Sequence, residues 1–515
     1  MLKQTKRNRS HYVKHRGSGI HMVCIWVCLL LLVLTLFYFQ KSADQNALQL
    51  DTEINSSTRS KKLEILKEDE EDEQQQQEEQ QNQKNPLVEE ELELPRDADQ
   101  DDDDCEGRRM YIYDLPPEFN TQILNFCDAY ESWTNFCDHM KNEGFGPKTH
   151  RRSKSWYKTD VYMLELIFHA RARSYDCRVM EPAEADLFFI PYYTGLDALR
   201  YLHGPDVNRS SEHGLQVVQW LSETGGSFWR RNGGSDHFVV MGRAAWDFSR
   251  SPWRVEGWGT SLLELPAMLN VTSLVLESRP FPWQEQAVPY PTAFHPAGSP
   301  SLALWTSRVR RSPRPFLFAF AGGGGTGVSP NVRRSIRTEC SNSSALWADS
   351  PPGLGLWSGC SFISCDDGRC DSEPGYVMRA MMKANFCLQP PGDTPTRRAT
   401  FDGIVAGCIP VFFEKQAAYT QYTWHLPADP KEYSVFINKD DVVFGGLKIG
   451  EVLANISRAE IVRMREKVIE LIPRVVYRKP EATDVGFKDA FDFAIEGVLQ
   501  RIKNRRNGTT TSGLL

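Results

Sequence analysis

Short apolar runs recur from residue 110 onward, and they alternate with longer stretches whose apolar residues repeat at helical spacing. A continuous apolar run is typical of a strand buried on both faces, as in a parallel sheet. Strands that alternate with helices indicate βαβ units, so the sequence predicts an α/β fold. The predicted strands lie at 110–115, 185–191, 237–241, 272–276, 316–321, 384–389 and 408–413.

The apolar runs fall into two consecutive series, which predicts two Rossmann-like domains facing across a cleft. We expect an N-terminal domain over 105–310, a C-terminal domain over 311–480 and a final helix over 481–505. Helices are predicted at 158–173 and 215–221. A further helix opens at the capping box of Ser457 and Glu460, and the last follows Asp484 and turns Phe487, Phe491, Ala494 and Val498 inward.

Residues 22–39 read MVCIWVCLLLLVLTLFYF, an apolar segment with one mildly polar side chain, Thr35. As a helix it would be roughly 27 Å long, enough for a thin bilayer. Six Lys and Arg residues lie in the basic tail 1–21 that precedes it, so the positive-inside rule places the N-terminus in the cytoplasm. A cleaved signal peptide usually has a shorter apolar stretch, and we therefore interpret the segment as an uncleaved signal anchor.

Residues 40–104 are rich in Gln and acidic residues, with 21 Asp/Glu against six Lys/Arg between 51 and 104. Such a stretch cannot bury a core, which predicts a disordered stem. Its DDDD run at 101–104 is interpreted as charge in a spacer and not as a metal site. The body beyond residue 104 carries 45 acids and 47 bases, so its charge gives no sign of nucleic-acid binding.

The segment 384–413 is predicted to form a strand, a loop, a helix and a second strand. The loop contains Gly392 and Asp393. Thr394 is the predicted N-cap and Pro395 the first helical residue. A helix that begins at the carboxyl edge of a parallel sheet offers free N–H groups, which form an anion site.

Arg397 and Arg398 follow in the predicted first turn, where guanidinium groups suit a diphosphate. Asp402 lies about one turn further on, where a carboxylate would accept hydrogen bonds from ribose hydroxyls. Together these residues indicate a nucleotide-sugar site. The alternative is an Arg398–Asp402 pair on the helix surface, which would have only a small structural effect.

These residues belong to longer stretches that resemble the exostosin-type glycosyltransferases (glycosyltransferase family 47), and most closely the plant xyloglucan galactosyltransferase clade. The resemblance covers about four-fifths of the chain, 105–500. It implies a GT-B fold, a UDP-sugar donor, inversion at the anomeric carbon, no obligatory metal or other cofactor, and a single-pass type II Golgi membrane protein with a lumenal body. The matching stretches are 112–116, 185–192, 236–238, 289–292, 294–296, 386–393, 401–402, 406–411 and 422–427.

The chain also departs from the wider family in its donor segment. That family usually has Glu where this chain has Asp402, and it has Arg where this chain has Ala399. Glu414 and Lys415 replace the small or His-containing sequence that is typical of the clade.

An inverting transfer needs a base that deprotonates the acceptor hydroxyl, and in the resembling family it is expected in the N-terminal domain. We prefer Asp247 and His295, because each follows a predicted strand in a polar or loop-like context; the other candidates are Asp114, Asp236 and His237. Trp424 and His425 are predicted to line the sugar or acceptor pocket, and packing in the core is the alternative.

Ten of the twelve cysteines lie beyond residue 100. We expect a disulfide and not a zinc site among Cys360, Cys365 and Cys370, a local Cys127–Cys137 pair, and free core thiols at Cys387 and Cys408. The N-glycosylation sequons are Asn55, Asn208, Asn270, Asn342, Asn455 and Asn507.

The expected function is transfer of galactose from UDP-galactose to xyloglucan side chains in cell-wall synthesis at the Golgi membrane, in a complex with other Golgi glycosyltransferases. One alternative is a UDP-galacturonate or UDP-pentose donor on a wall glycan. Another is a non-catalytic, glycan-binding scaffold subunit, which would have no need of a diphosphate site.

Overall fold

A computed structural model of the chain describes residues 105–130, 135–150, 153–202, 211–251, 258–323, 331–346, 358–366 and 368–508. All of these residues lie in one compact unit, Asp102–Leu515. The predicted basic tail, signal anchor and stem lie outside the described residues. Among the helices that the structure describes, none combines the length and the apolar character that crossing a bilayer requires.

The first half of the unit is built on a six-stranded sheet in the order β2-β1-β3-β4-β5-β6, in which every pair of neighbours is parallel. The buried apolar runs predicted as strands form β1, β3, β4 and β5. The strands are β1 (Met110–Ile112), β2 (Arg178–Val179), β3 (Leu187–Ile190), β4 (His237–Ala244), β5 (Thr272–Glu277) and β6 (Glu285–Ala287). The helices of this half before β6 are α2 (Leu164–Arg173), α3 (Thr194–Leu202), α4 (Glu212–Thr224) and α5 (Gly226–Arg230).

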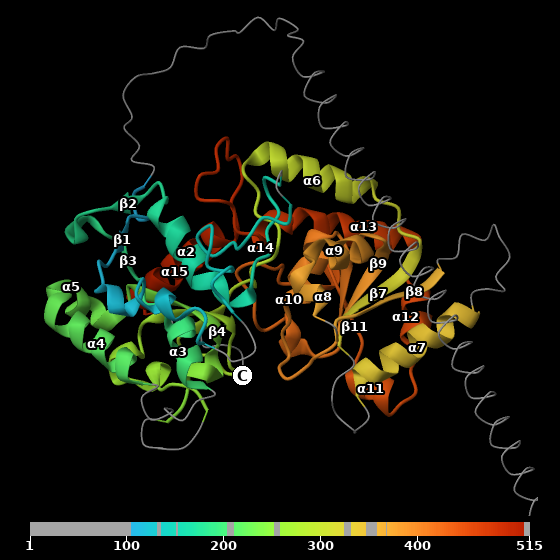
Figure 1. Cartoon of the computed structure of the whole chain (residues 1–515), viewed down its shortest axis with the longest axis horizontal. Helices are drawn as coiled ribbons and strands as arrows, with labels where there is room; N and C mark the ends of the chain where they lie inside the picture. Colours follow the sequence, from blue (N-terminus) through green and yellow to red (C-terminus); the bar gives the residue numbers. More distant parts are fainter. Residues whose placement is uncertain are drawn as a thin grey trace, which may run out of the picture. The chain divides into compact units, whose positions relative to one another are not determined.

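The second half is built on a five-stranded parallel sheet in the order β11-β10-β9-β7-β8. Figure 1 shows its strands in yellow and orange, apart from the blue and green elements of the first sheet. The strands are β7 (Phe316–Gly322), β8 (Ser358–Ser364), β9 (Ala384–Gln389), β10 (Ile409–Phe412) and β11 (Val435–Phe436). The helices are α6 (Ser299–Arg311), α7 (Val332–Leu346), α8 (Arg369–Ser372), α9 (Pro374–Met382), α10 (Arg398–Val405), α11 (Lys439–Val443), α12 (Ile449–Ala454), α13 (Arg458–Glu470) and α14 (Ile472–Val475).

Each sheet has its own hydrophobic core, and the last helix completes the core of the first one. Helix α15 (Ala490–Arg506) follows the second half in sequence, but its buried face, which includes Phe491, Ala494 and Val498, packs in the first core. Figure 1 shows this dark red helix among the blue and green elements. The predicted inward face is therefore confirmed for these three residues. Phe487 is a correction, because it precedes the helix and packs against the second core.

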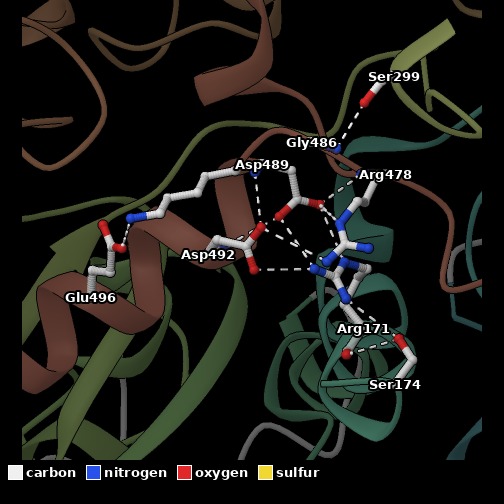
Figure 2. Close-up of polar contacts among 9 residues, drawn as sticks. Arg171, Ser174, Ser299, Arg478, Gly486, Asp489, Asp492 and Glu496 are labelled. Carbon is white, nitrogen blue, oxygen red and sulfur yellow. Dashed lines mark hydrogen bonds and ion pairs between the residues drawn. The ribbon is translucent and has the colours of Figure 1, made fainter. Parts of the chain in front are cut away.

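A buried ionic network fastens the N-terminus of α15 to α2 (Figure 2). Arg171 donates to Asp489 Oδ2 at 3.2 Å and to Asp492 Oδ1 at 3.2 Å, and Asp489 also caps α15 in a capping box with Asp492. Although burial by itself would raise it, the Arg171 charge keeps the pKa of Asp489 below its ordinary value. Because these charges are removed from water, loss of one partner would leave the other buried and uncompensated.

The ten cysteines beyond residue 100 form five disulfides. The predicted Cys127–Cys137 pair is confirmed, and so is disulfide bonding of the 360, 365 and 370 cysteines. The prediction of free thiols at Cys387 and Cys408 is wrong. Parallel pairing of β9 with β10 places Cys387 opposite Pro410 and thereby brings Cys408 within disulfide reach. The remaining bridges are Cys105–Cys177, Cys340–Cys360 and Cys365–Cys370.

Candidate donor-binding site

The loop between β9 and α10 lies at the carboxyl edge of the second sheet. Helix α10 begins at Arg398, with Arg397 as its N-cap and no hydrogen bond from the Arg397 side chain to the first turn. The predicted start at Pro395 with Thr394 as N-cap is wrong. The hydroxyls of Thr394 and Thr396 donate to the carboxylate of Glu277 instead of capping the helix.

Arg333 on α7 joins the carboxyl ends of β7 and β9. Its guanidinium donates to Pro391 O at 2.9 Å, Gly323 O at 3.1 Å and Pro390 O at 3.4 Å. The chain order of this sheet reverses between β7 and β9, and open α/β sheets bind their ligands in the crevice at such a switch point. Burial lowers the pKa of Arg333, and the nearby charge of Arg397 lowers it further.

Arg397 folds back over its own loop. Its Nη1 donates to Thr394 Oγ1 at 2.9 Å and to Thr396 O at 2.6 Å. A Cβ on Gly392 would lie 1.7 Å from Arg397 Nη2, so a larger residue there would displace the guanidinium. Asp393 is exposed beside it.

Arg398 and Asp402 form the helical pair that their spacing predicts. Arg398 Nε lies 3.2 Å from Asp402 Oδ2, and Arg398 Nη1 donates across to Thr159 O in the first half at 2.6 Å. The two side chains are only 19% and 15% exposed, so the pair is partly buried and not on the open helix surface. They line a small hollow together with Ala293, Cys370, Pro374, Val377 and Met378.

The site therefore gathers three guanidinium groups around the start of α10. Those of Arg333 and Arg397 are met by carbonyl and hydroxyl oxygens, which leave the positive charge in place. Guanidinium groups and the N-terminus of a helix both favour phosphate oxygens. The arrangement can thus hold a diphosphate.

Asp247 lies in the loop after β4, near the carboxyl edge of the first sheet. Its Oδ2 accepts from Arg243 Nε at 2.6 Å, and its Oδ1 accepts from Trp258 Nε1 at 2.5 Å. The carboxylate is only 4% exposed. The structure thus places Asp247 on the expected edge and shows both of its oxygens bonded.

His295 is fully buried where the chain passes between the halves. Its Nδ1 contacts Tyr477 O at 2.7 Å and its Nε2 contacts Thr159 Oγ1 at 2.8 Å. Burial lowers its pKa to about 3, so the ring is neutral at physiological pH. Because a carbonyl can only accept, Nδ1 carries the proton. The Thr159 hydroxyl also lies 2.8 Å from Phe145 O, so its one proton is shared between that carbonyl and Nε2. This geometry gives no support to a role of His295 as the base. Instead, His295 connects Thr159 in the first half with Tyr477.

Trp424 and His425 contact α15, as the alternative of core packing predicts. His425 is fully buried and its Nε2 donates to Ala490 O at 3.0 Å. The Trp424 ring lies directly against Gly497, and Arg501 stacks over it at 5.1 Å. The pocket assignment of His425 is therefore corrected, because its packing partner arrives only with the last helix. Trp424 is half-buried, and its place in a sugar pocket stays a prediction.

The other candidate bases divide between core and surface. Asp236 and His237 are buried and bonded to each other at 2.7 Å, and His237 also contacts Tyr113 OH at 2.8 Å, so they are polar groups of the first core. Asp114 is exposed at the end of β1. Within the part of the chain that the structure describes, no three His, Cys, Asp or Glu side chains cluster as metal ligands would.

The sequence reasoning missed two residues of this region, Arg333 and Glu277. Glu277 is the last residue of β5, so the rule that ligands gather at the carboxyl ends of parallel strands would have found it. Arg333 is the second residue of α7, and the approach of this helix start to the loop after β9 is known only from the fold.

The predicted sequons are exposed where the structure describes them. Asn270, Asn455 and Asn507 lie at the surface. Asn55 and Asn208 lie outside the described residues, and so does the side chain of Asn342.

Comparison with known proteins agrees with this geometry. Residues 104–453 match the family described as the Exostosin GT47 domain. The chain is 51% identical over 409 residues to the Arabidopsis thaliana protein named "Probable xyloglucan galactosyltransferase GT19", with 78% of this chain and 92% of that protein covered. Two further Arabidopsis thaliana proteins are "Xyloglucan-specific galacturonosyltransferase 1" (38% identity; 77% of this chain, 58% of that protein) and "Xyloglucan galactosyltransferase XLT2" (37% identity; 78% and 77%). The chain thus belongs to the exostosin GT47 family.

Proposed function

We propose that the protein is an inverting galactosyltransferase that moves galactose from UDP-galactose to side chains of xyloglucan. The observation that carries the proposal is the group of three arginines at the start of α10, which suits the diphosphate of a nucleotide sugar. The names of the relatives, xyloglucan galactosyltransferases at 51% and 37% identity, support the sugar and the acceptor.

The proposed architecture is GT-B, with an acceptor domain at 105–310, a donor domain at 311–480 and a closing helix within 481–505. Two parallel sheets in series and a last helix that returns to the first core support it. Contacts such as Arg398 Nη1 to Thr159 O at 2.6 Å join the two halves beside the donor loop.

In the proposed reaction, Arg333, Arg397 and Arg398 hold the diphosphate, and Asp402 accepts from the ribose hydroxyls. An acceptor hydroxyl attacks the anomeric carbon in line, a new glycosidic bond forms, and the bond to the UDP oxygen breaks. The same guanidinium groups stabilise the negative charge that develops on the leaving diphosphate. Asp247 remains the proposed base for the acceptor proton, because it lies in the loop after β4 in the first half.

We expect no obligatory metal, because fixed guanidinium groups and the helix N-terminus can carry the charge that a cation would otherwise neutralise. Transfer should therefore continue in the presence of a chelator. A strict requirement for a divalent cation would contradict this proposal.

The proposed location is the Golgi membrane, in a single-pass type II orientation with a lumenal body. The signal anchor at 22–39, five disulfides and exposed sequons such as Asn270 support it. Protease added to sealed microsomes should spare residues 105–515. Digestion of the body in intact vesicles would overturn the orientation.

A donor screen tests the function most directly. Full-length protein would be incubated with xyloglucan oligosaccharides and, in separate reactions, UDP-galactose, UDP-galacturonate or a UDP-pentose, and the products would be weighed by mass spectrometry. We expect a hexose added from UDP-galactose, and loss of the product with Arg398→Ala. No transfer from any donor, together with no binding of UDP by calorimetry, would favour the non-catalytic scaffold.

Galacturonosyl transfer is the second candidate, and a specific observation favours it. One relative at 38% identity is named as a xyloglucan-specific galacturonosyltransferase. The same screen separates the two sugars, since a uronate product is heavier than a hexose product and carries a negative charge.

A further inference from the structure

Glu277 reaches from the first half into the donor loop of the second. It ends β5 and is only 2% exposed. Its Oε2 accepts from Thr394 Oγ1 at 2.7 Å, from Thr396 N at 3.1 Å and from Thr396 Oγ1. One carboxylate oxygen thus fixes the backbone and both hydroxyls of the turn that leads into α10.

The same turn holds Arg397. The guanidinium donates to Thr394 Oγ1 at 2.9 Å, and that hydroxyl in turn donates a hydrogen bond to Glu277 Oε2. Tyr290 OH lies 3.0 Å from Thr396 Oγ1, and it is the donor of this pair because the single Thr396 proton faces the carboxylate. A chain of oriented hydrogen bonds therefore runs from the arginine to the carboxylate.

The halves also meet next to Glu277, which supports a fixed position for the carboxylate. Ser278 N and Oγ donate to Gln421 Oε1 at 2.8 and 2.9 Å, and Tyr422 OH donates to Leu276 O at 3.0 Å. The end of β5 is thus bonded to the second half on both sides of Glu277.

We propose that Glu277 is a positioning residue of the donor site: it holds the turn 394–397 so that the Arg397 guanidinium and the first N–H groups of α10 face the diphosphate. This inference rests on the proposed donor site. It also links donor binding to the contact between the halves, because the carboxylate and the turn belong to different halves.

Glu277 is not placed to act as the base. A base must come within hydrogen-bond reach of the acceptor hydroxyl. The Glu277 Oε2 accepts three donors from the donor turn, so its contacts tie this carboxylate to the turn and not to an acceptor hydroxyl. The two roles give different kinetic results, which makes them separable.

The test measures UDP binding to the full-length protein by calorimetry. Glu277→Gln replaces an oxygen acceptor with an amide in the same space, and Thr396→Val removes one hydroxyl donor. We expect each variant, measured at a temperature where it is folded, to bind UDP about tenfold more weakly. The double variant should be no weaker than the worse single variant, because both substitutions break the same contact.

The matched control is Glu264→Gln. Glu264 is a carboxylate of the same half that accepts from Arg279 Nη1 at 2.8 Å, and among the described residues it has no bond to the donor turn. Its UDP affinity should equal that of the wild type. If Glu277→Gln does not fold, Thr394→Val removes one of the three bonds, as Thr396→Val does, and should also weaken UDP binding by about tenfold.

Wild-type UDP affinity in Glu277→Gln and Thr396→Val would overturn the inference while leaving the donor site intact, provided that Arg398→Ala still weakens binding. A fall in kcat of a hundredfold or so at unchanged UDP affinity, with loss of the acidic limb of the pH profile, would overturn it in favour of a base. Failure of the wild type to bind UDP would overturn both the donor site and this inference.

Discussion

Helices α3 and α10 occupy equivalent places in the two halves. When the strands of each sheet are counted in chain order, each helix follows the third strand, and this strand lies between the first and the fourth. The third strand is β3 in the first half and β9 in the second. In the first half the start of the helix is occupied by the protein's own carboxylate. Glu165 on α2 accepts from Gly195 N at 2.5 Å and from Leu196 N at 3.3 Å. In the second half Arg397 and Arg398 stand at the start of the helix instead.

This difference shows which of the two helix N-termini can accept an anion from a ligand. Glu165 also accepts from Gly242 N at 2.9 Å and from Thr194 Oγ1 at 2.9 Å, so an internal carboxyl group already occupies the N–H groups at the start of α3. At α10 the Glu277 carboxylate comes from the other half and accepts from Thr394 and Thr396, which precede the N-cap Arg397. A ligand diphosphate therefore has a place at α10 and none at α3.

The largest effect on stability should come from removing the Glu165 side chain. Glu165→Ala leaves three buried N–H groups without their acceptor, and each such group costs about 1–3 kcal/mol. We expect the free energy of unfolding to fall by about 3–5 kcal/mol, measured by chemical denaturation. Glu496→Ala, at an exposed carboxylate paired with Lys488, is the control and should change it by less than about 0.5 kcal/mol. Near-wild-type stability of Glu165→Ala would show that α3 does not depend on its carboxylate.

The next largest effect concerns UDP binding at the start of α10. Arg398→Ala removes a charge-assisted contact to the diphosphate, worth about 1.5–3 kcal/mol, so UDP affinity should fall by about ten- to a hundredfold. Calorimetry measures the affinity, and Arg463→Ala on the surface of α13 is the matched control. Unchanged UDP affinity in Arg398→Ala, with the protein folded, would remove the donor site from α10.

The sequence predicts most of the fold because buried parallel strands leave an apolar run. β1, β3, β4, β5, β7, β9 and β10 were found in this way. β2 and β11 have two residues each, too few to show a pattern, and β6 has the largely polar sequence EQA. β8 has seven residues, but its sequence SGCSFIS is polar and glycine-containing, so it resembles a loop.

The candidate site is less predictable because half of it is assembled from distant residues. Arg397, Arg398 and Asp402 were found because they share one short segment with a helix start. Glu277 and Thr396 are 119 residues apart, and no local pattern joins them. His295 was misjudged for a related reason: a histidine in a polar stretch of sequence gives no sign that both of its nitrogens are bonded in the interior.

Glu165, which contacts the start of α3, should also make the stability of the protein depend on pH. Burial raises the pKa of Glu165 to about 7, from an ordinary 4.5. Between these values the folded protein holds a proton that the unfolded chain has lost, so stability should decrease as pH rises from about 4.5 to about 7, on the order of 1 kcal/mol per pH unit. Denaturation curves at several pH values measure this slope, and Glu165→Gln should flatten it. An unchanged slope in Glu165→Gln would assign the pH dependence to other groups.

The smallest effect should separate ribose binding by Asp402 from diphosphate binding by the arginines at α10. Asp402→Asn keeps the size of the side chain but weakens its acceptance from ribose hydroxyls, which should cost about 1 kcal/mol, or roughly fivefold in UDP affinity. Inorganic pyrophosphate has no ribose, and the substitution removes a negative charge that lies 3.2 Å from Arg398. Pyrophosphate affinity should therefore stay the same or rise. If UDP and pyrophosphate weaken together, Asp402 acts by holding Arg398 in place, and the ribose assignment fails while the anion site at α10 remains.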